Sequence, residues 1–134
     1  MHMEDSGAYT SPALLLEIDS LLRELGRDLA VLADRPDDLG VRARLAVTPE
    51  RLSRRALRLP SATMVALARR VEDTCLGMRA ITSPLPPPVL AALWEGHAAL
   101  VDQLEAVRAG TDVAHPWRAL RALDRCIEDI LRNG

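Results

Sequence analysis

Leucine and other apolar residues recur every three or four positions through most of this 134-residue chain. In the segment 12–33, for example, Leu14, Ile18, Leu21 and Leu25 follow one another at these spacings. This is the period of an α-helix that buries one face. Because no run of alternating β-branched residues occurs, the sequence predicts an all-α fold.

Proline and hydroxyl residues mark where the helices begin. Ser11, Thr48 and Ser83 each stand directly before a proline, and Ser61 directly follows one. Hydroxyl side chains cap the unpaired N–H groups of a first helical turn, and proline fits its first position. We therefore expect helices over 12–33, 48–58, 61–80, 87–108 and 116–132. The segment 37–45 can add a helical turn before the second of them.

The long helices each carry one apolar and one charged face, which is typical of an antiparallel helical bundle with short loops. We predict one domain over residues 1–134, of four long helices and one short helix, with residues 1–10 disordered. The final helix is expected to turn Trp117 and Leu131 inward. The predicted core is Leu14, Ile18, Leu21, Leu25, Leu67, Val71, Cys75, Leu93, His97, Leu100, Leu104, Leu123 and Ile127.

Glycines lie inside three of the predicted helices, at Gly26, Gly77 and Gly96. Each costs a helix about 1 kcal/mol relative to alanine. Their presence suggests close helix crossings.

The composition bounds the class of protein. Phenylalanine and lysine are absent, while alanine, arginine, leucine and proline are abundant, as in proteins of GC-rich bacterial genomes. No apolar run approaches the roughly 20 residues that span a bilayer, and no signal peptide begins the chain, so we expect a cytoplasmic protein. Cys75 and Cys126 are isolated on apolar faces, which predicts buried free thiols. We expect no cofactor and no metal site.

Charge is distributed unevenly along the chain. Residues 39–71 carry eight arginines and a single acid, Glu50, whereas the flanking segments hold nine acids each against three and six arginines. A basic segment in a nearly neutral protein predicts a surface for an acidic partner. The predicted partner-binding residues are Arg44, Arg51, Arg54, Arg55, Arg58 and Arg69.

Two other interpretations of this segment stay open. Arg51, Arg54, Arg55 and Arg58 form one stripe on a helix, which can be a solvated face paired with the acidic first helix. The stripe can also bind nucleic acid phosphates. That reading is less favoured, because no aromatic stacking platform accompanies the stripe.

Three segments of this chain resemble a known protein family. They are Leu29–Leu39 (LAVLADRPDDL), Met64–Asp73 (MVALARRVED) and Leu85–Val107. The stretches resemble the histidine-phosphotransfer domain of chemotaxis-type histidine kinases, over nearly the whole chain. The resemblance implies a helical bundle that docks a receiver domain in bacterial two-component signalling.

The phosphorylation motif of that family is missing. Its alanine–histidine pair and following lysine–glycine pair fall on Pro49-Glu50 and Ser53-Arg54. Phosphotransfer through this position is therefore excluded, and the resemblance implies docking without phosphate transfer. Glu50 is a candidate phosphomimetic, a fixed negative charge where phosphohistidine would lie. A Glu after Thr-Pro also simply favours a helix N-terminus.

Two histidines offer alternatives. His97 lies on an apolar stripe and is expected in the core, with one ring nitrogen bonded to a neighbouring helix, rather than as a metal ligand or phosphorylated residue. Arg108 and His115 resemble the Arg-x(4–6)-His motif of HEPN-type ribonucleases, which implies RNA cleavage. His115 can equally cap the final helix. A third alternative is a homodimer anchored by Trp94.

The sequence thus favours a non-catalytic protein-interaction module in bacterial signalling. It would dock an acidic, receiver-like partner through the arginine stripe.

Overall fold

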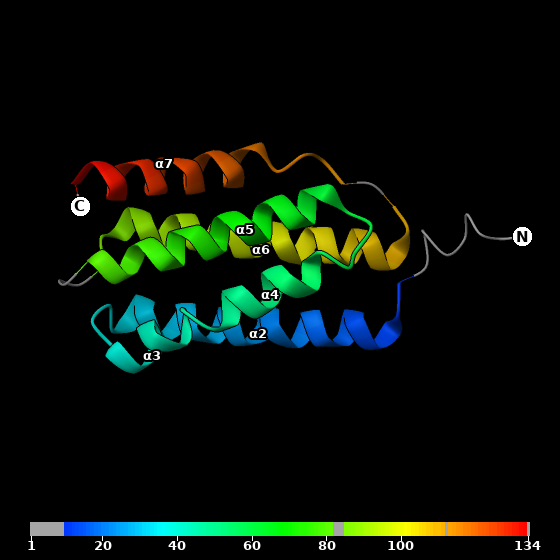
Figure 1. Cartoon of the computed structure of the whole chain (residues 1–134), viewed down its shortest axis with the longest axis horizontal. Coiled ribbons are helices and arrows are strands. Elements are labelled where there is room, and N and C mark those ends of the chain that lie inside the picture. The colour runs from blue at the N-terminus through cyan, green and yellow to red at the C-terminus, as the bar shows by residue number, and fades with distance from the viewer. Residues whose placement is uncertain (1–9, 82–84, 112, 134) are drawn as a thin grey trace, which may run out of the picture.

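Helices are the only regular elements in the part of the chain that the computed structural model describes, residues 10–81, 85–111 and 113–133 (Figure 1). The four long helices are α2 (Pro12–Asp34), α5 (Ala62–Gly77), α6 (Pro87–Ala109) and α7 (Trp117–Asn133). The shorter elements are α3 (Leu39–Arg44), α4 (Thr48–Ala56) and the 3-10 turn η1 (Met78–Ala80). The predicted all-α bundle is confirmed, and the segment 37–45 forms a second short helix.

Not every expectation falls within this description. The predicted disorder of residues 1–10 concerns a segment of which only Thr10 is described. Within the described ranges, no helix combines the length and the apolar character needed to cross a membrane.

Side-chain caps begin three of the helices. Ser11 and Ser61 each accept a hydrogen bond from the backbone N–H three residues further on, at 3.4 and 3.1 Å. Asp38 does the same at the start of α3, at 3.0 Å. Thr48 was expected to cap α4, and this was wrong. Thr48 is instead the first residue of the helix and is buried, and the N-cap residue, Val47, makes no side-chain cap hydrogen bond.

Four helices close into a ring. In chain order α2 packs on α4, α4 on α5, α5 on α6, and α6 again on α2. Figure 1 shows that α2, α4, α5, α6 and α7 alternate in direction along the long axis of the molecule. The last helix, α7, packs outside the ring against both α5 and α6. The predicted antiparallel arrangement is therefore present, with α7 as an added outer helix.

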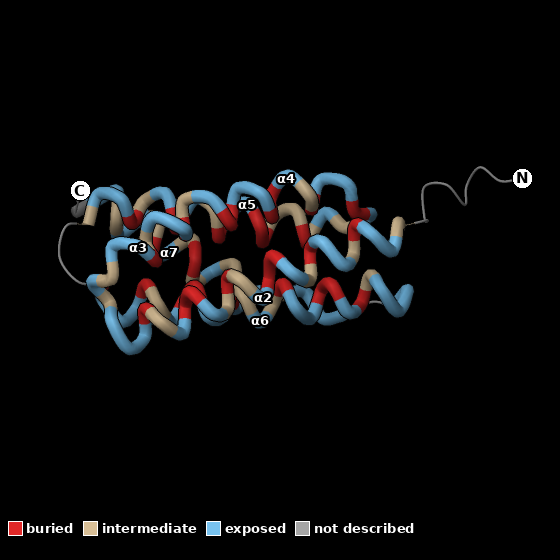
Figure 2. The backbone as a smooth tube through the Cα atoms, turned by 90° about the horizontal axis from the view of Figure 1, so that it is seen from below, coloured by how far each residue is buried: buried red, intermediate tan, exposed pale blue. Residues whose placement is uncertain are grey.

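Leucine fills the interior of this ring. Figure 2 shows buried positions recurring along one side of each helix, as the apolar spacing predicts. All the expected core residues are buried except His97 and Ile127, which are half-buried. Each fully buried leucine stabilises the fold by roughly 1.5–3 kcal/mol relative to an exposed one.

The helix glycines lie at close contacts between helices. A methyl group added to Gly96 of α6 would lie only 2.9 Å from Val71 on α5 and 3.1 Å from Leu123 on α7. One added to Gly77 would lie 3.2 Å from Ile130 on α7. Side chains of neighbouring helices therefore occupy the space that a Cβ would need. The suggestion of close crossings is confirmed.

The expected inward face of α7 was partly wrong. Trp117 and Leu131 are 69% and 77% exposed, whereas Ala119, Leu123 and Cys126 are buried. Because α7 contacts the ring on one side only, it can bury only a narrow stripe. Trp117 lies two residues before Ala119, about 160° around the helix from that stripe, and so faces solvent.

The close approach at Gly96 gives a stability prediction. Gly96→Ala should lower the free energy of unfolding by about 1 kcal/mol, because overpacking against a stiff valine costs more than alanine gains in helix propensity. Gly40→Ala, on exposed α3, is the matched control. Its added methyl would meet only an Asp38 oxygen at 3.4 Å, so it should raise stability by about 0.5–1 kcal/mol. Urea unfolding of both variants measures the difference, and equal stabilisation would contradict the close packing.

Candidate functional site

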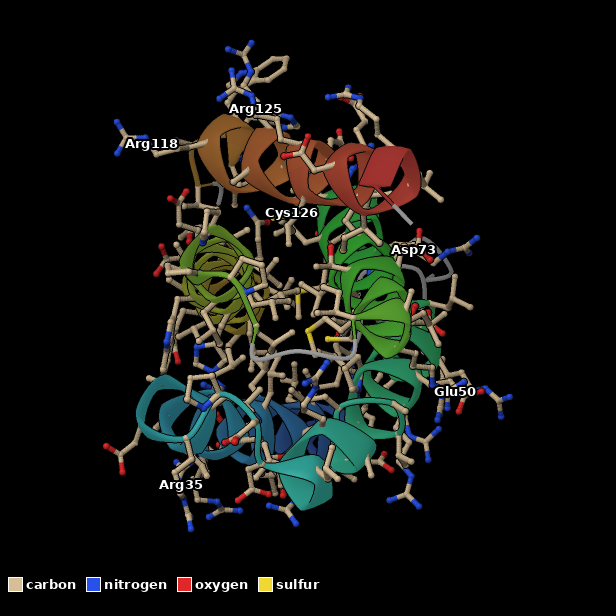
Figure 3. All side chains as sticks on the ribbon, turned by 90° about the vertical axis from the view of Figure 1, so that its left-hand side faces the viewer. Arg35, Glu50, Asp73, Arg118, Arg125 and Cys126 are labelled. Atoms are coloured by element: carbon tan, nitrogen blue, oxygen red, sulfur yellow. The ribbon has the colours of Figure 1, made fainter. Side chains whose placement is uncertain are left out.

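The predicted arginine stripe lies on the outer surface of α4 and the turn that follows it. Figure 3 looks along the bundle and shows Glu50 of α4 pointing away from the core. Arg51, Arg54 and Arg58 are exposed, and Arg55 is half-buried. The stripe is therefore a surface feature, as its charge requires.

Two of the predicted binding residues are held by acids of α2. Arg44 pairs with Asp28 at 3.1 Å, and Arg55 pairs with Glu17 at 2.7 Å. The Asp28 side chain is only 9% exposed, so its carboxylate depends on Arg44 for a counter-charge. These two arginines join α3 and α4 to α2. This part of the stripe matches the alternative in which it pairs with the acidic first helix.

Glu50, the phosphomimetic candidate, is also paired. Its carboxylate accepts a hydrogen bond from Arg54 at 3.2 Å, one turn further along α4. Pro49 stands in the first turn of the helix, so Glu50 lies near the N-terminus and not at mid-length. The negative charge of Glu50 is therefore partly neutralised and also favoured by the helix end.

Three predicted residues remain without an acidic partner. Arg51, Arg58 and Arg69 are exposed, and none of them forms an ion pair with any residue in the described ranges. Leu57, directly before Arg58, is 62% exposed. We call Arg51, Arg58 and Arg69 the α4 patch, although Arg58 lies in the turn after α4 and Arg69 belongs to the neighbouring helix α5.

Two further arginines of the basic segment hold the fold together. Arg42 of α3 donates hydrogen bonds to the backbone carbonyls of Met78, at 3.2 Å, and Ile81, at the end of η1. Arg70 of α5 pairs with Asp124 of α7 at 2.8 Å. Only part of the basic segment is therefore available to a partner.

His97 takes the role expected of a core histidine. Its Nε2 lies 2.8 Å from the backbone oxygen of Leu22 on α2, and since a carbonyl only accepts, Nε2–H donates. Gly26, one turn further along α2, leaves the room for this ring, because an added Cβ would lie 3.0 Å from Nε2. With Nε2 engaged, the ring joins two helices. Trp94, the suggested homodimer anchor, stands edge-on to it at 5.8 Å and is 37% exposed.

The candidate ribonuclease pair is not brought into a common cavity. Arg108 bonds to Glu105 at 2.8 Å, one turn earlier on α6. His115 instead packs edge-on against the ring of Trp117, with centroids 4.8 Å apart. Two hollows are bordered by His115, and Arg108 lines neither. Within one copy of the chain, the two residues therefore share neither of these hollows.

Both cysteines are buried free thiols, as predicted. Burial, together with the nearby Glu72 carboxylate, raises the pKa of the Cys75 thiol to about 12. Burial and, to a smaller extent, Asp129 also raise the pKa of Cys126, whose thiol lies 3.6 Å from the carbonyl oxygen of Pro88. Neither is an activated nucleophile. No cluster of three or more His, Cys, Asp or Glu side chains suited to a metal occurs in the described part of the chain.

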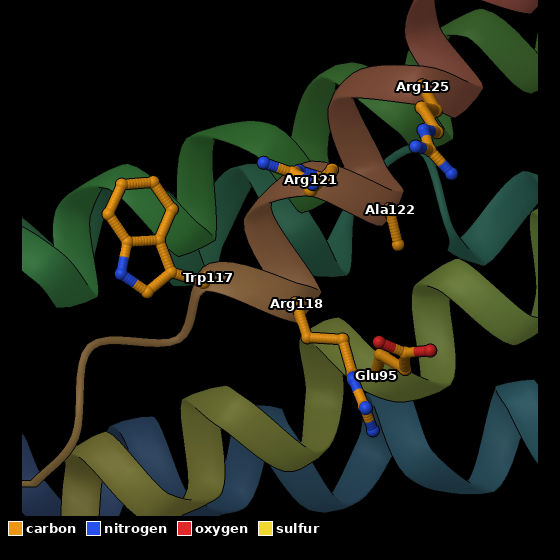
Figure 4. Close-up of a pocket in the computed structure, with 6 residues that line it drawn as sticks. All are labelled: Glu95, Trp117, Arg118, Arg121, Ala122 and Arg125. Carbon is orange, nitrogen blue, oxygen red and sulfur yellow. The ribbon is translucent and has the colours of Figure 1, made fainter.

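A second basic surface, on α7, was missed by sequence reasoning. Trp117, Arg118, Arg121 and Arg125 line a hollow of about 510 Å³, together with Glu95 of α6 (Figure 4). None of the three arginines has an ion-pair partner among the residues described. We call Trp117 and these arginines the α7 patch. The three- and four-residue spacing of the arginines was a visible signal, but Trp117 was expected to face inward.

The division of the arginines predicts different effects of substitution. Arg44→Gln should destabilise the protein by about 1 kcal/mol or more, because it leaves the Asp28 carboxylate buried without a counter-charge. Arg51→Gln should change stability by less than about 0.5 kcal/mol, since it removes only an exposed side chain. Thermal and urea unfolding compare the two variants. Equal effects would mean that the Arg44 pair is no more than a surface contact.

Because the pKa of the Cys75 thiol is raised in the folded protein, we expect the protein to lose stability at alkaline pH. Stability is intact below about pH 9 and declines as the pH rises toward 12. One thiol gives a slope of up to about 1.4 kcal/mol per pH unit. The chain has no lysine, so few other groups titrate in this window, and Cys126, whose pKa is also raised, adds a slope of the same sign. Cys75→Ala should be less stable at neutral pH yet show a smaller alkaline slope in urea unfolding. An unchanged slope would assign the effect to other groups.

Comparison with known proteins found no matching family model, no matching curated protein and no matching solved structure. The geometry of the two patches therefore carries the functional argument. The resemblance to histidine-phosphotransfer domains stays an expectation from the sequence.

Proposed function

We propose that this chain is a non-catalytic, cytoplasmic interaction module of bacterial signalling that docks an acidic protein through the α4 patch. The observation that carries the proposal is the set of three exposed arginines, Arg51, Arg58 and Arg69, without an acidic partner among the described residues. Exposed guanidinium groups bind carboxylates in bidentate pairs, which fix the orientation of a partner as well as its charge.

The surroundings of the patch support this reading. Two acids on α2 and α4 are already engaged by other arginines. Glu17 pairs with Arg55, and Glu50 pairs with Arg54. A partner's carboxylates would thus meet arginines whose charge is not already compensated. Exposed Leu57 supplies apolar area beside Arg58, and an apolar contact surrounded by charges is a common arrangement in interfaces.

A receiver domain is the partner that the sequence resemblance favours. Glu50 takes the place of the family's histidine in the ungapped register, and it lies exposed on the same helix as Arg51. Transfer of phosphate is not part of the proposal, because the histidine that carries the phosphate in that family is absent from this position. The proposal is of docking alone.

Affinity capture tests the proposal. Immobilised wild type should retain an acidic protein from its native lysate, and the variant Arg51→Glu/Arg58→Glu should not. Binding of the purified partner should weaken at least tenfold in the variant and should decline with salt, because rim charges act mainly through electrostatic attraction.

The matched control reverses charge on the other surface. Arg118→Glu/Arg121→Glu should capture the same acidic protein as wild type, and circular dichroism should show that both variants stay folded. Capture of the same partner by the α4-patch variant with unchanged affinity would reject the proposed docking surface.

A further inference from the structure

The α7 patch combines an exposed aromatic ring with unpaired arginines. Trp117 is 69% exposed, although tryptophan usually hides most of its apolar surface. Its ring stands edge-on to that of His115, with centroids 4.8 Å apart and planes at 68°. The indole is thereby held against a second ring while its remaining surface stays open to solvent.

The arginines of the patch are not needed by the fold. Of the three acids on α7, Asp124 is engaged by Arg70 and Asp129 by Arg132, at 2.8 and 3.5 Å. No ion pair joins Arg118, Arg121 or Arg125 to any acid in the described ranges, which distinguishes them from Arg132 on the same helix. Their charge is available to an anionic ligand.

The geometry of the patch is linear. Figure 4 shows Trp117 at one end, followed along α7 by Arg121 and Arg125, with Arg118 reaching toward α6. Arg121 and Arg125 are one turn apart, roughly 6 Å along the axis. At a helical repeat of 3.6 residues, all four side chains of the patch leave α7 within about 100° of arc. A strand could therefore place a base on the indole while its backbone follows the arginines.

We propose that the α7 patch binds single-stranded RNA. A base stacks on Trp117, and Arg118, Arg121 and Arg125 contact the phosphates, since unpaired bases bind aromatic side chains and phosphates bind arginine. Glu95, the acid that lines the same hollow, repels phosphate but accepts a hydrogen bond from a ribose 2′-hydroxyl. This acid favours RNA over DNA. The proposal concerns a different surface from the α4 patch and does not depend on it.

Fluorescence titration with oligouridylate tests the proposal, in a Trp94→Phe background so that Trp117 is the only tryptophan. Stacking should quench the Trp117 emission. In an anisotropy assay with labelled oligouridylate, Trp117→Ala should weaken binding about 5-fold to 100-fold, and Trp117→Phe should restore part of the affinity. Replacing Arg121 and Arg125 by Gln should lower the salt dependence, by about 0.7 in the log–log slope for each lost phosphate contact.

The matched ligand is an oligodeoxyuridylate, which lacks only the 2′-hydroxyl. Wild type should bind the RNA about 2–10 times more tightly, and Glu95→Ala should remove that preference. Arg51→Glu/Arg58→Glu should bind RNA as wild type does, which separates this site from the docking surface.

Three results would overturn the proposal. They are the absence of binding to oligouridylate at low salt, equal affinity in wild type and Trp117→Ala, and tighter binding of the DNA strand. Displacement of the RNA by a polyglutamate peptide that binds more tightly and quenches Trp117 equally would make the surface a protein-docking site instead.

Discussion

Gly96 and His97, adjacent on α6, connect this helix to all three of its neighbours. The missing side chain of Gly96 lets Val71 of α5 and Leu123 of α7 pack closely, while His97 donates a hydrogen bond to Leu22 of α2. In a core without phenylalanine, leucine and valine fill the space only if the helices come close together. The closed ring and the position of α7 on its outside both depend on this contact region.

Burial decides which arginines of the basic segment serve the fold. Asp28 is nearly inaccessible and needs Arg44, while Arg42 donates hydrogen bonds to the carbonyls of Met78 and Ile81 and so joins α3 to η1. Arg51 and Arg58 face outward, where α2 offers them no carboxylate. The basic segment of the sequence thus contains two kinds of arginine. Some bond to other parts of the fold, and the others stay exposed on the surface without an acidic partner among the residues that the structure describes.

The two patches lie on different sides of the molecule. In the end-on view of Figure 3, Glu50 marks the α4 side and Arg125 marks the outer side of α7. They also differ in chemistry, because Trp117 gives the α7 patch an aromatic surface, whereas the α4 patch has only exposed Leu57 beside its arginines. A module that uses both patches could hold an acidic protein and an RNA strand at once.

The sequence by itself determined the helices, most of the core and the surface location of the basic segment, since apolar periodicity, capping residues and charge act over a few neighbouring residues. It also predicted the hydrogen bond of the His97 ring to a neighbouring helix. It did not determine the direction of Trp117, because its helical pattern is compatible with more than one buried face. Only the docking of α7 on one side of the ring decided which face was covered. The tertiary structure likewise decided which arginines remain unpaired, because ion pairs such as Arg55 with Glu17 join residues that only folding brings together.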